Sequence, residues 1–217
     1  MKVKGLQITN MLLAGAMTVF AFWVAASLEP GAELPIHWNA TGEVDQFATA
    51  IVALLLPVGV SLLMGGLFSA IPRLEQTQGR LDAWAPLLRS TWIGVMLLLI
   101  FLQLTIAAPG LGWNIGPDLV LVGVGVLLIL IGDILPKSRP NFFVGIRTPW
   151  TLADTDNWIA SHRLGGKIMV IAGCLMVLAA FVQLPTNARI AVILILTSVS
   201  ALVPVAYSWW LWRDKAG

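Results

Sequence analysis

The sequence alternates long apolar stretches with shorter polar segments. The core of a bilayer is about 30 Å thick, so a helix needs roughly 20 apolar residues to cross it. Six stretches approach that length and are almost free of charged side chains. They centre on residues 8–26, 48–71, 92–108, 119–134, 168–184 and 190–211. This pattern predicts an all-α integral membrane protein, built as a bundle of about six transmembrane helices.

The basic residues define an orientation for this bundle. If the N-terminus lies inside, Arg189 is the one member of the 13 Lys and Arg residues that falls in an outer segment. Because cytoplasmic loops are enriched in Lys and Arg, the N- and C-termini are both predicted to be cytoplasmic. The first stretch follows Lys2 and Lys4 and ends in small residues, as a signal peptide does, but its apolar core is long for one. It is therefore taken as the first span.

Composition supports the same class. The 217 residues are 58% hydrophobic and 11% charged, whereas soluble domains are about 25% charged. The net charge is only +2, and the basic residues lie between apolar stretches rather than in a patch, so no nucleic-acid partner is expected. The single cysteine, Cys174, lies in an apolar stretch. It excludes an internal disulfide, gives no metal-ligand spacing, and is expected to be a small core residue.

The outer segment at residues 33–45 is longer than a connection requires. Within it, residues 39–42 predict a turn, because Asn and Gly tolerate unusual backbone angles. Two interpretations are open. The segment is either an acidic loop that Trp38 packs against the lipid interface, or a surface that binds a cation or a basic peptide. His37 has no partner at a metal-ligand spacing, so no metal site is predicted. The acidic residues in or near the outer segments are Glu29, Glu33, Glu43, Asp45 and Asp118.

The inner segment at residues 132–152 is the second long polar connection. Its three prolines exclude a continuous helix, because each removes a backbone donor and restricts the residue before it. The apolar middle of the segment, residues 142–146, is expected to dip back into the membrane interface.

A short helix is predicted to follow, with Asp154 or Thr155 as its cap. The glycine pair at residues 165–166 is expected to end this helix before the fifth span. Trp158 and His162 are four residues apart and therefore share one helix face. They either anchor the helix at the interface or belong to a functional site.

Arg147 lies between apolar residues of the inner segment. An unpaired guanidinium near the membrane is costly, so Arg147 is predicted to be held by a carboxylate. The nearest candidates in the sequence are Asp133, Asp154 and Asp156. If Arg147 only follows the positive-inside rule, lysine should serve as well in its place.

Both polar segments resemble a known family. The LPIHWN run at residues 34–39, with Gly42 and Asp45, is similar to an N-terminal domain of unknown function that often precedes the SdpI part. The second motif resembles the signature of the SdpI family of bacterial membrane proteins and comprises residues 135–141 and 145–151, Trp158, His162 and Arg163. Asp133 departs from the family pattern, in which an asparagine is expected after the glycine.

The resemblance covers residues 10–215 and divides the chain into two units. Residues 1–72 would form an N-terminal two-span unit with the outer LPIHWN loop. Residues 73–217 would form an SdpI-like four-span unit with the cytoplasmic NFFVGIRTPWT loop.

The best-known member of the family is an immunity protein against a toxin that kills sibling cells. The resemblance therefore implies a multi-pass protein of the bacterial cell membrane that confers immunity to, or senses, an extracellular toxic peptide and signals to a cytoplasmic repressor. The implied partners are the lipid bilayer, that peptide and that repressor, and no cofactor is implied. The residues implied in ligand or partner recognition are His37, Trp38, Asn39, Gly42, Asp45, Asn141, Gly145, Arg147, Thr148, Pro149, Trp150, Trp158, His162 and Arg163.

Two other classes are weighed against this one. No motif of a membrane enzyme is present, so no enzymatic activity is expected. A small secondary transporter is the stronger alternative, although ion-coupled carriers place ionisable groups near the membrane midplane and this chain has none there. Residues 57–61 and 204–208 are alike, which is weak evidence of an internal repeat.

Overall fold

The computed structural model describes residues 3–39, 43–75, 81–182 and 184–216. Six helices within these ranges are long and apolar enough to cross a membrane, which confirms the expected multi-pass class. The elements are α1 (Val3–Ser27), β1 (Glu33–Trp38), β2 (Val44–Thr49), α2 (Ala50–Glu75), α3 (Leu81–Ala107), α4 (Asp118–Ile134), the short 3-10 helix η1 (Leu135–Lys137), α5 (Pro149–Ala153), α6 (Thr155–Ala179) and α7 (Thr186–Ala216).

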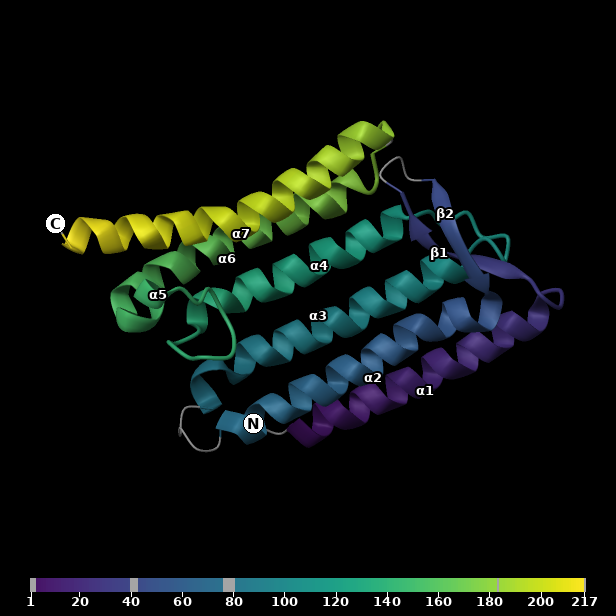
Figure 1. The fold of residues 1–217 in the computed structure, drawn as a ribbon, viewed down its shortest axis with the longest axis horizontal. Coiled ribbons are helices and arrows are strands. Elements are labelled where there is room, and N and C mark those ends of the chain that lie inside the picture. The colour runs from purple at the N-terminus through teal and green to yellow at the C-terminus, as the bar shows by residue number, and fades with distance from the viewer. Residues whose placement is uncertain (1–2, 40–42, 76–80, 183, 217) are drawn as a thin grey trace.

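The six long helices lie side by side in sequence order, from α1 to α7 (Figure 1). The N- and C-terminal ends of the chain and α5 lie at one end of the bundle, and the strands lie at the other. We call these the inner and the outer end, after the orientation that the basic residues predict. An even number of spans places both chain ends on one side, as the sequence indicated.

The predicted helix break at residues 165–166 is wrong, because α6 runs through it without interruption. Glycine costs an isolated helix up to about 1 kcal/mol relative to alanine, but here it lets two helices approach each other. A Cβ atom on Gly166 would lie 2.6 Å from the carbonyl oxygen of Gly132, and a Cβ on Gly132 would lie 2.7 Å from that of Gly166. The glycine pair is therefore a contact between α4 and α6 rather than a stop signal.

A second glycine contact lies two helical turns away, where Gly125 of α4 meets Gly173 of α6. Gly125 and Gly132 are seven residues apart on α4, and Gly166 and Gly173 are seven residues apart on α6. Seven residues are about two helical turns, so each pair lies on one face of its helix. Close backbone packing of this kind holds helices together in lipid, where apolar burial does not favour association. Cys174, next to Gly173, is exposed on the surface of α6 and is not the core residue that the sequence suggested.

Strands β1 and β2 form an antiparallel hairpin at the outer end, which the sequence did not predict. Leu34 of β1 is only 2% exposed and packs into a cluster with Val24 of α1, Leu54 of α2 and Ile106 of α3. Trp38 packs against the same cluster. Trp38 therefore contacts the bundle, and its contact with the lipid interface stays a prediction.

Arg189, the exception to the basic-residue rule, lies in the first turn of α7 at the outer end. Its Nη1 atom is 3.1 Å from Oδ1 of Asp118, the first residue of α4. Both side chains are about one-third exposed, with 29% and 34% of their surfaces accessible. The outer positive charge is thus paired with a carboxylate.

Candidate recognition site

Asn141 folds the inner segment back on itself. Its Oδ1 atom accepts hydrogen bonds from the backbone N–H groups of Phe143 at 2.9 Å and Val144 at 2.8 Å. Its Nδ2 atom donates to the carbonyl oxygen of Arg139 at 2.9 Å. Asparagine favours this kind of turn because its side chain can bond to backbone groups a few residues away. Asn141 is buried and so shapes the loop rather than meeting a partner directly.

The apolar part of the loop lies on the inner end of the bundle. Phe143 and Val144 pack against a buried cluster that includes Phe68 of α2 and Trp92 of α3. Phe142 points the other way and is 63% exposed. The loop therefore adheres to the protein through two apolar side chains and presents a third at its surface.

Trp158 and His162 of α6 form the centre of the inner site. Their rings stack with centroids 3.9 Å apart and planes inclined by 16°. Neither side chain is accessible to solvent or lipid, so the interpretation of this pair as an interfacial anchor is wrong. Gly145 lies on the stack with φ of 119°. A Cβ atom at Gly145 would be 2.6 Å from Nε2 of His162.

The hydrogen bonds of His162 define its protonation. Nε2 accepts from the backbone N–H of Ile146 at 3.0 Å, and Nδ1 lies 2.8 Å from the carbonyl oxygen of Trp158. A backbone amide can only donate and a carbonyl can only accept, so His162 is neutral with its proton on Nδ1. Both ring nitrogens are occupied by these bonds. The arrangement makes His162 a support for the loop and leaves it no lone pair for a metal ion or proton transfer.

Thr148 starts the short helix α5 through a reciprocal pair of bonds. Its Oγ1 atom accepts from the N–H of Thr151 at 3.3 Å, and Oγ1 of Thr151 accepts from the N–H of Thr148 at 2.9 Å. Pro149 occupies the first helical position, where a missing N–H costs nothing. Thr151 also donates to the carbonyl oxygen of Ile146 at 2.9 Å, which connects α5 to the loop over His162.

Trp150 connects this region to α7. Its Nε1 atom donates to Oγ of Ser208 at 2.6 Å, and its ring stacks on Trp212 at a centroid distance of 5.9 Å. Asn157 of α6 donates to the carbonyl oxygen of Ser208 at 2.8 Å and accepts from Ser161 at 3.0 Å. We call the network of Asn141, Gly145, Thr148, Trp150, Asn157, Trp158, Ser161, His162 and Ser208 the inner frame. Six of its residues are buried, Thr148 and Trp150 are half-buried, and Gly145 is exposed.

Asn157, Ser161 and Ser208 of the inner frame were not among the expected site residues. All three are almost completely buried. One signal was available for two of them, because Asn157 and Ser161 are polar, four residues apart and next to Trp158 and His162. Ser208 had no local signal, since its partners in the inner frame, Trp150 and Asn157, lie more than 50 positions away in the sequence.

Arg147 is not held by a carboxylate, so that prediction is wrong for the part of the chain that the structure describes. Its guanidinium is exposed and donates to the carbonyl oxygen of Phe142. Asp133 instead pairs with Lys137 at 3.2 Å, and Asp154 pairs with Lys215 at 2.7 Å. The guanidinium stays in contact with solvent and therefore avoids the desolvation cost that would require a counter-charge.

Asp154 caps α6, as the sequence predicted, by accepting from the N–H of Asp156 at 2.9 Å. Its ion pair with Lys215 connects the start of α6 to the end of α7. The hydrogen bond from the Lys215 ammonium lowers the pKa of the Asp154 carboxyl below its usual value. Arg163, about two and a half turns from Asp154 along α6, is exposed.

The outer motif presents a hydrogen-bonded pair of side chains on the hairpin. Nδ1 of His37 lies 2.6 Å from Oδ1 of Asp45, and the two side chains are 56% and 40% exposed. Asn39 closes the hairpin by hydrogen bonds with Glu43, including N–H to carbonyl at 2.8 Å. Gly42 lies outside the described residues. No group of three His, Cys, Asp or Glu side chains in the described ranges could hold a metal ion.

The expected residues thus fall into two kinds. At the inner end, Asn141, Trp158 and His162 are buried and Thr148 and Trp150 are half-buried, whereas the others, Gly145, Arg147, Pro149 and Arg163, are exposed. At the outer end, His37 and Asp45 are exposed on a short hairpin. Both ends offer surfaces suited to recognition.

Comparison with known proteins bears on the inner frame directly. The sequence model of the SdpI/YfhL protein family matches residues 137–208. These residues form an SdpI-type segment. It begins at the last residue of η1 and ends at Ser208, so every residue of the inner frame lies within it. The N-terminal motif with His37 and Trp38 lies outside this match.

A curated relative extends the likeness beyond the SdpI-type segment. The chain is 28% identical over 172 residues to the immunity protein SdpI of Bacillus subtilis strain 168, which covers 79% of each chain. No solved structure matches the chain. The family match, this relative and the six spans identify a multi-pass protein of the bacterial plasma membrane.

Proposed function

We propose that this protein confers immunity on the cell that makes it, by binding an extracellular toxic peptide, and that it acts by binding rather than by catalysis. The observation that carries the proposal is the coincidence of the SdpI-type segment with the inner frame. The likeness to an immunity protein over 79% of both chains supports it. A frame of buried hydrogen bonds suits a protein that must hold one shape in order to recognise a partner.

The outer hairpin is the surface that we assign to the peptide. Glu29, Glu33 and Asp45 are exposed at or near it, so this end of the molecule attracts cationic ligands. The hairpin is anchored to the bundle by Leu34 and Trp38. An ordered, acidic surface outside the membrane fits a positively charged peptide better than a neutral one.

The inner site is the surface that we assign to a cytoplasmic repressor. Phe142 and Arg147 project from a loop whose backbone is fixed by Asn141 and His162. An apolar ring beside a guanidinium is typical of residues that dominate protein–protein interfaces. Arg163 adds a second exposed cation on the adjoining helix.

Immunity can be tested in a Bacillus subtilis strain that lacks its own SdpI and is challenged with the toxin. Expression of this chain should restore survival. The pair His37→Gln and Asp45→Asn should reduce protection, because together they replace the exposed imidazole and remove the carboxylate charge at this surface. Gln46→Ala is the matched control, since Gln46 is an exposed neighbour on β2. Unchanged killing of cells that hold the protein in their membrane would overturn the proposal.

A further inference from the structure

A cavity of about 370 Å³ lies between α1 and α2, in the half of the bundle nearer the inner end. Gln7 and Asn10 of α1, Gly66 and Ser69 of α2, and Trp92 of α3 line it. The cavity opens sideways, towards lipid, because Gly66 is exposed and the neighbouring Met11 is 55% exposed.

Asn10 supplies the polar floor of this cavity and is only 1% exposed. Its Oδ1 atom accepts from Nε1 of Trp92 at 3.1 Å, and its Nδ2 atom donates to the carbonyl oxygen of Ser61 at 3.2 Å. A carboxamide has two N–H groups, so one remains for a further acceptor. The carboxamide of Gln7 adds two more donors at the rim.

Two adjacent glycines of α2, Gly65 and Gly66, contribute to the cavity in different ways. A Cβ atom on Gly65 would lie 2.5 Å from Nδ2 of Asn10, so Gly65 makes room for that carboxamide. A Cβ atom on Gly66 would meet nothing within 4 Å, so Gly66 opens the cavity itself. A larger side chain at Gly66 would fill the space without displacing the protein.

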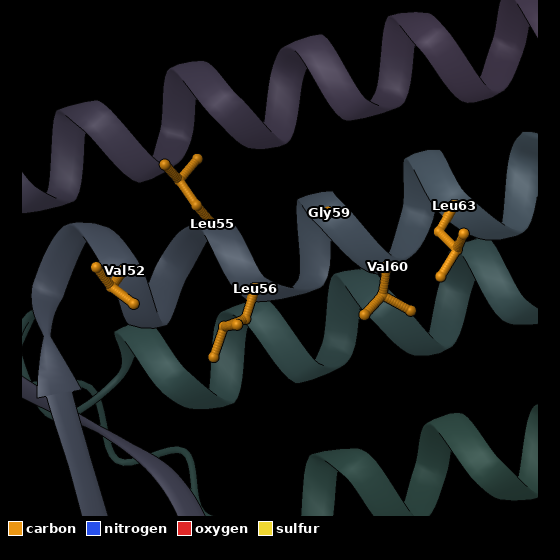
Figure 2. A pocket seen from close by; sticks show the side chains of 6 residues that line it. All are labelled: Val52, Leu55, Leu56, Gly59, Val60 and Leu63. Carbon is orange, nitrogen blue, oxygen red and sulfur yellow. The ribbon is translucent and has the colours of Figure 1, made fainter.

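A second hollow on α2 provides a contrast (Figure 2). It lies around Gly59, whose missing Cβ would also meet nothing within 4 Å. Its other lining residues are aliphatic: Val52, Leu55, Leu56, Val60 and Leu63. Apolar contacts with a lipid acyl chain are sufficient to fill that groove, because its lining offers no polar side chain. The cavity at Gly66 differs because it also offers hydrogen-bond donors.

The depth of the cavity matches one part of a lipid. Asn10 lies six residues from Lys4, and Gly66 lies six residues from Pro72, at the inner ends of their spans. Six residues of helix correspond to about 9 Å. The polar interface occupies roughly 5–7 Å on each side of the hydrocarbon core. With the span ends taken as the outer edge of the polar interface, the cavity lies just below the level where acyl chains join their ester groups.

We propose that this cavity binds one phospholipid of the inner-side leaflet. An ester carbonyl accepts hydrogen bonds from Asn10 and Gln7, and the attached acyl chain lies across Gly66. Phospholipid is the occupant because the cavity opens onto the bilayer, where lipid is the solvent. A buried donor facing lipid is costly unless an acceptor reaches it, and the ester carbonyl is the acceptor at this depth. The site is independent of the proposed immunity function.

The test uses the full chain in nanodiscs that contain equal amounts of diester and diether phosphatidylglycerol of the same chain length. Diether lipid lacks the carbonyl but keeps the head group and chains. Lipids that stay bound are identified by native mass spectrometry. The wild-type chain should retain the diester about fivefold more often, the effect of one net hydrogen bond. Equal retention of both lipids by the wild-type chain would overturn the proposal.

Two variants locate the preference. Gly66→Leu should abolish it by filling the cavity, whereas Gly59→Leu, which fills the apolar groove, should leave it intact. A preference that survives Gly66→Leu, or that Gly59→Leu removes equally, would count against this site. If Gly66→Leu does not fold, Gln7→Leu replaces it, since Gln7 lies at the rim and its loss should reduce the preference. A Gln7→Leu chain that keeps the full preference would also contradict the proposal.

Discussion

Replacing Gly145 by alanine tests the inner frame at its tightest point. Gly145 has φ of 119°, a conformation that residues with a Cβ rarely adopt. The new Cβ would also lie 2.6 Å from Nε2 of His162 and 3.1 Å from the ring of Trp158. The loop must then move away, which breaks the hydrogen bond between Ile146 and His162.

The expected loss of stability in Gly145→Ala is the sum of two energy terms. An unfavourable backbone conformation costs of order 1–3 kcal/mol, and the loss of one hydrogen bond costs about 1 kcal/mol. The sum is about 3 kcal/mol, which corresponds to a fall of roughly 6–12 °C in the unfolding midpoint of a chain this size. Thermal unfolding of the purified protein in detergent measures it.

Gly31→Ala is the matched control for the backbone term. Gly31 has φ of 85°, but its Cβ would meet nothing within 4 Å. It should therefore show the conformational cost alone, about 2 kcal/mol, which corresponds to a fall of roughly 4–8 °C. If the two variants unfold at the same temperature, the contact between Gly145 and the Trp158–His162 stack contributes nothing, and the reasoning is refuted.

Three further outcomes are expected. Arg147→Lys should retain more repressor at the membrane than Arg147→Ala, because Arg147 donates to a carbonyl, and no carboxylate among the described residues holds it in a planar fork. A single cysteine at Pro117 should label from outside the cell, and one at Ala153 only after permeabilisation; external labelling at Ala153 would reverse the orientation. Asp154→Asn should lower the unfolding midpoint at pH 7. Since pairing with Lys215 lowers the pKa of Asp154 in the folded chain, that difference should shrink as the pH falls below about 4.

The sequence predicted the spans because bilayer thickness constrains the length of an apolar helix regardless of its neighbours. It also predicted that Trp158 and His162 share a face, since that follows from helix geometry alone. It failed at residues 165–166, where glycine serves a contact with α4 that depends on a residue more than 30 positions away. Local propensity cannot distinguish a glycine that ends a helix from one that admits another helix.

The errors at the candidate site have a similar cause. The carboxylate expected for Arg147 was inferred from burial that the loop does not have, since it turns that side chain outward. Ser208 was missed because its role depends on Trp150 and Asn157, which only the tertiary structure brings near. The donors around Asn10 were missed for the same reason. Residue types and their spacing in the sequence indicated the candidate site residues. Only the tertiary contacts showed which of them belong to the inner frame and which are exposed at the surface.

The inner frame also has a consequence for the order of assembly. Helix α7 follows every other part of the frame in the sequence, yet Ser208 supplies partners for both Trp150 and Asn157, and Lys215 pairs with Asp154. Until α7 has entered the membrane, the indole N–H of Trp150, the Nδ2 group of Asn157 and the Asp154 carboxylate lack these α7 partners. A nascent chain that stalls before α7 would therefore expose its polar groups to lipid or to proteases. The frame thus forms only after membrane insertion reaches α7, which makes its closure a natural checkpoint in biogenesis.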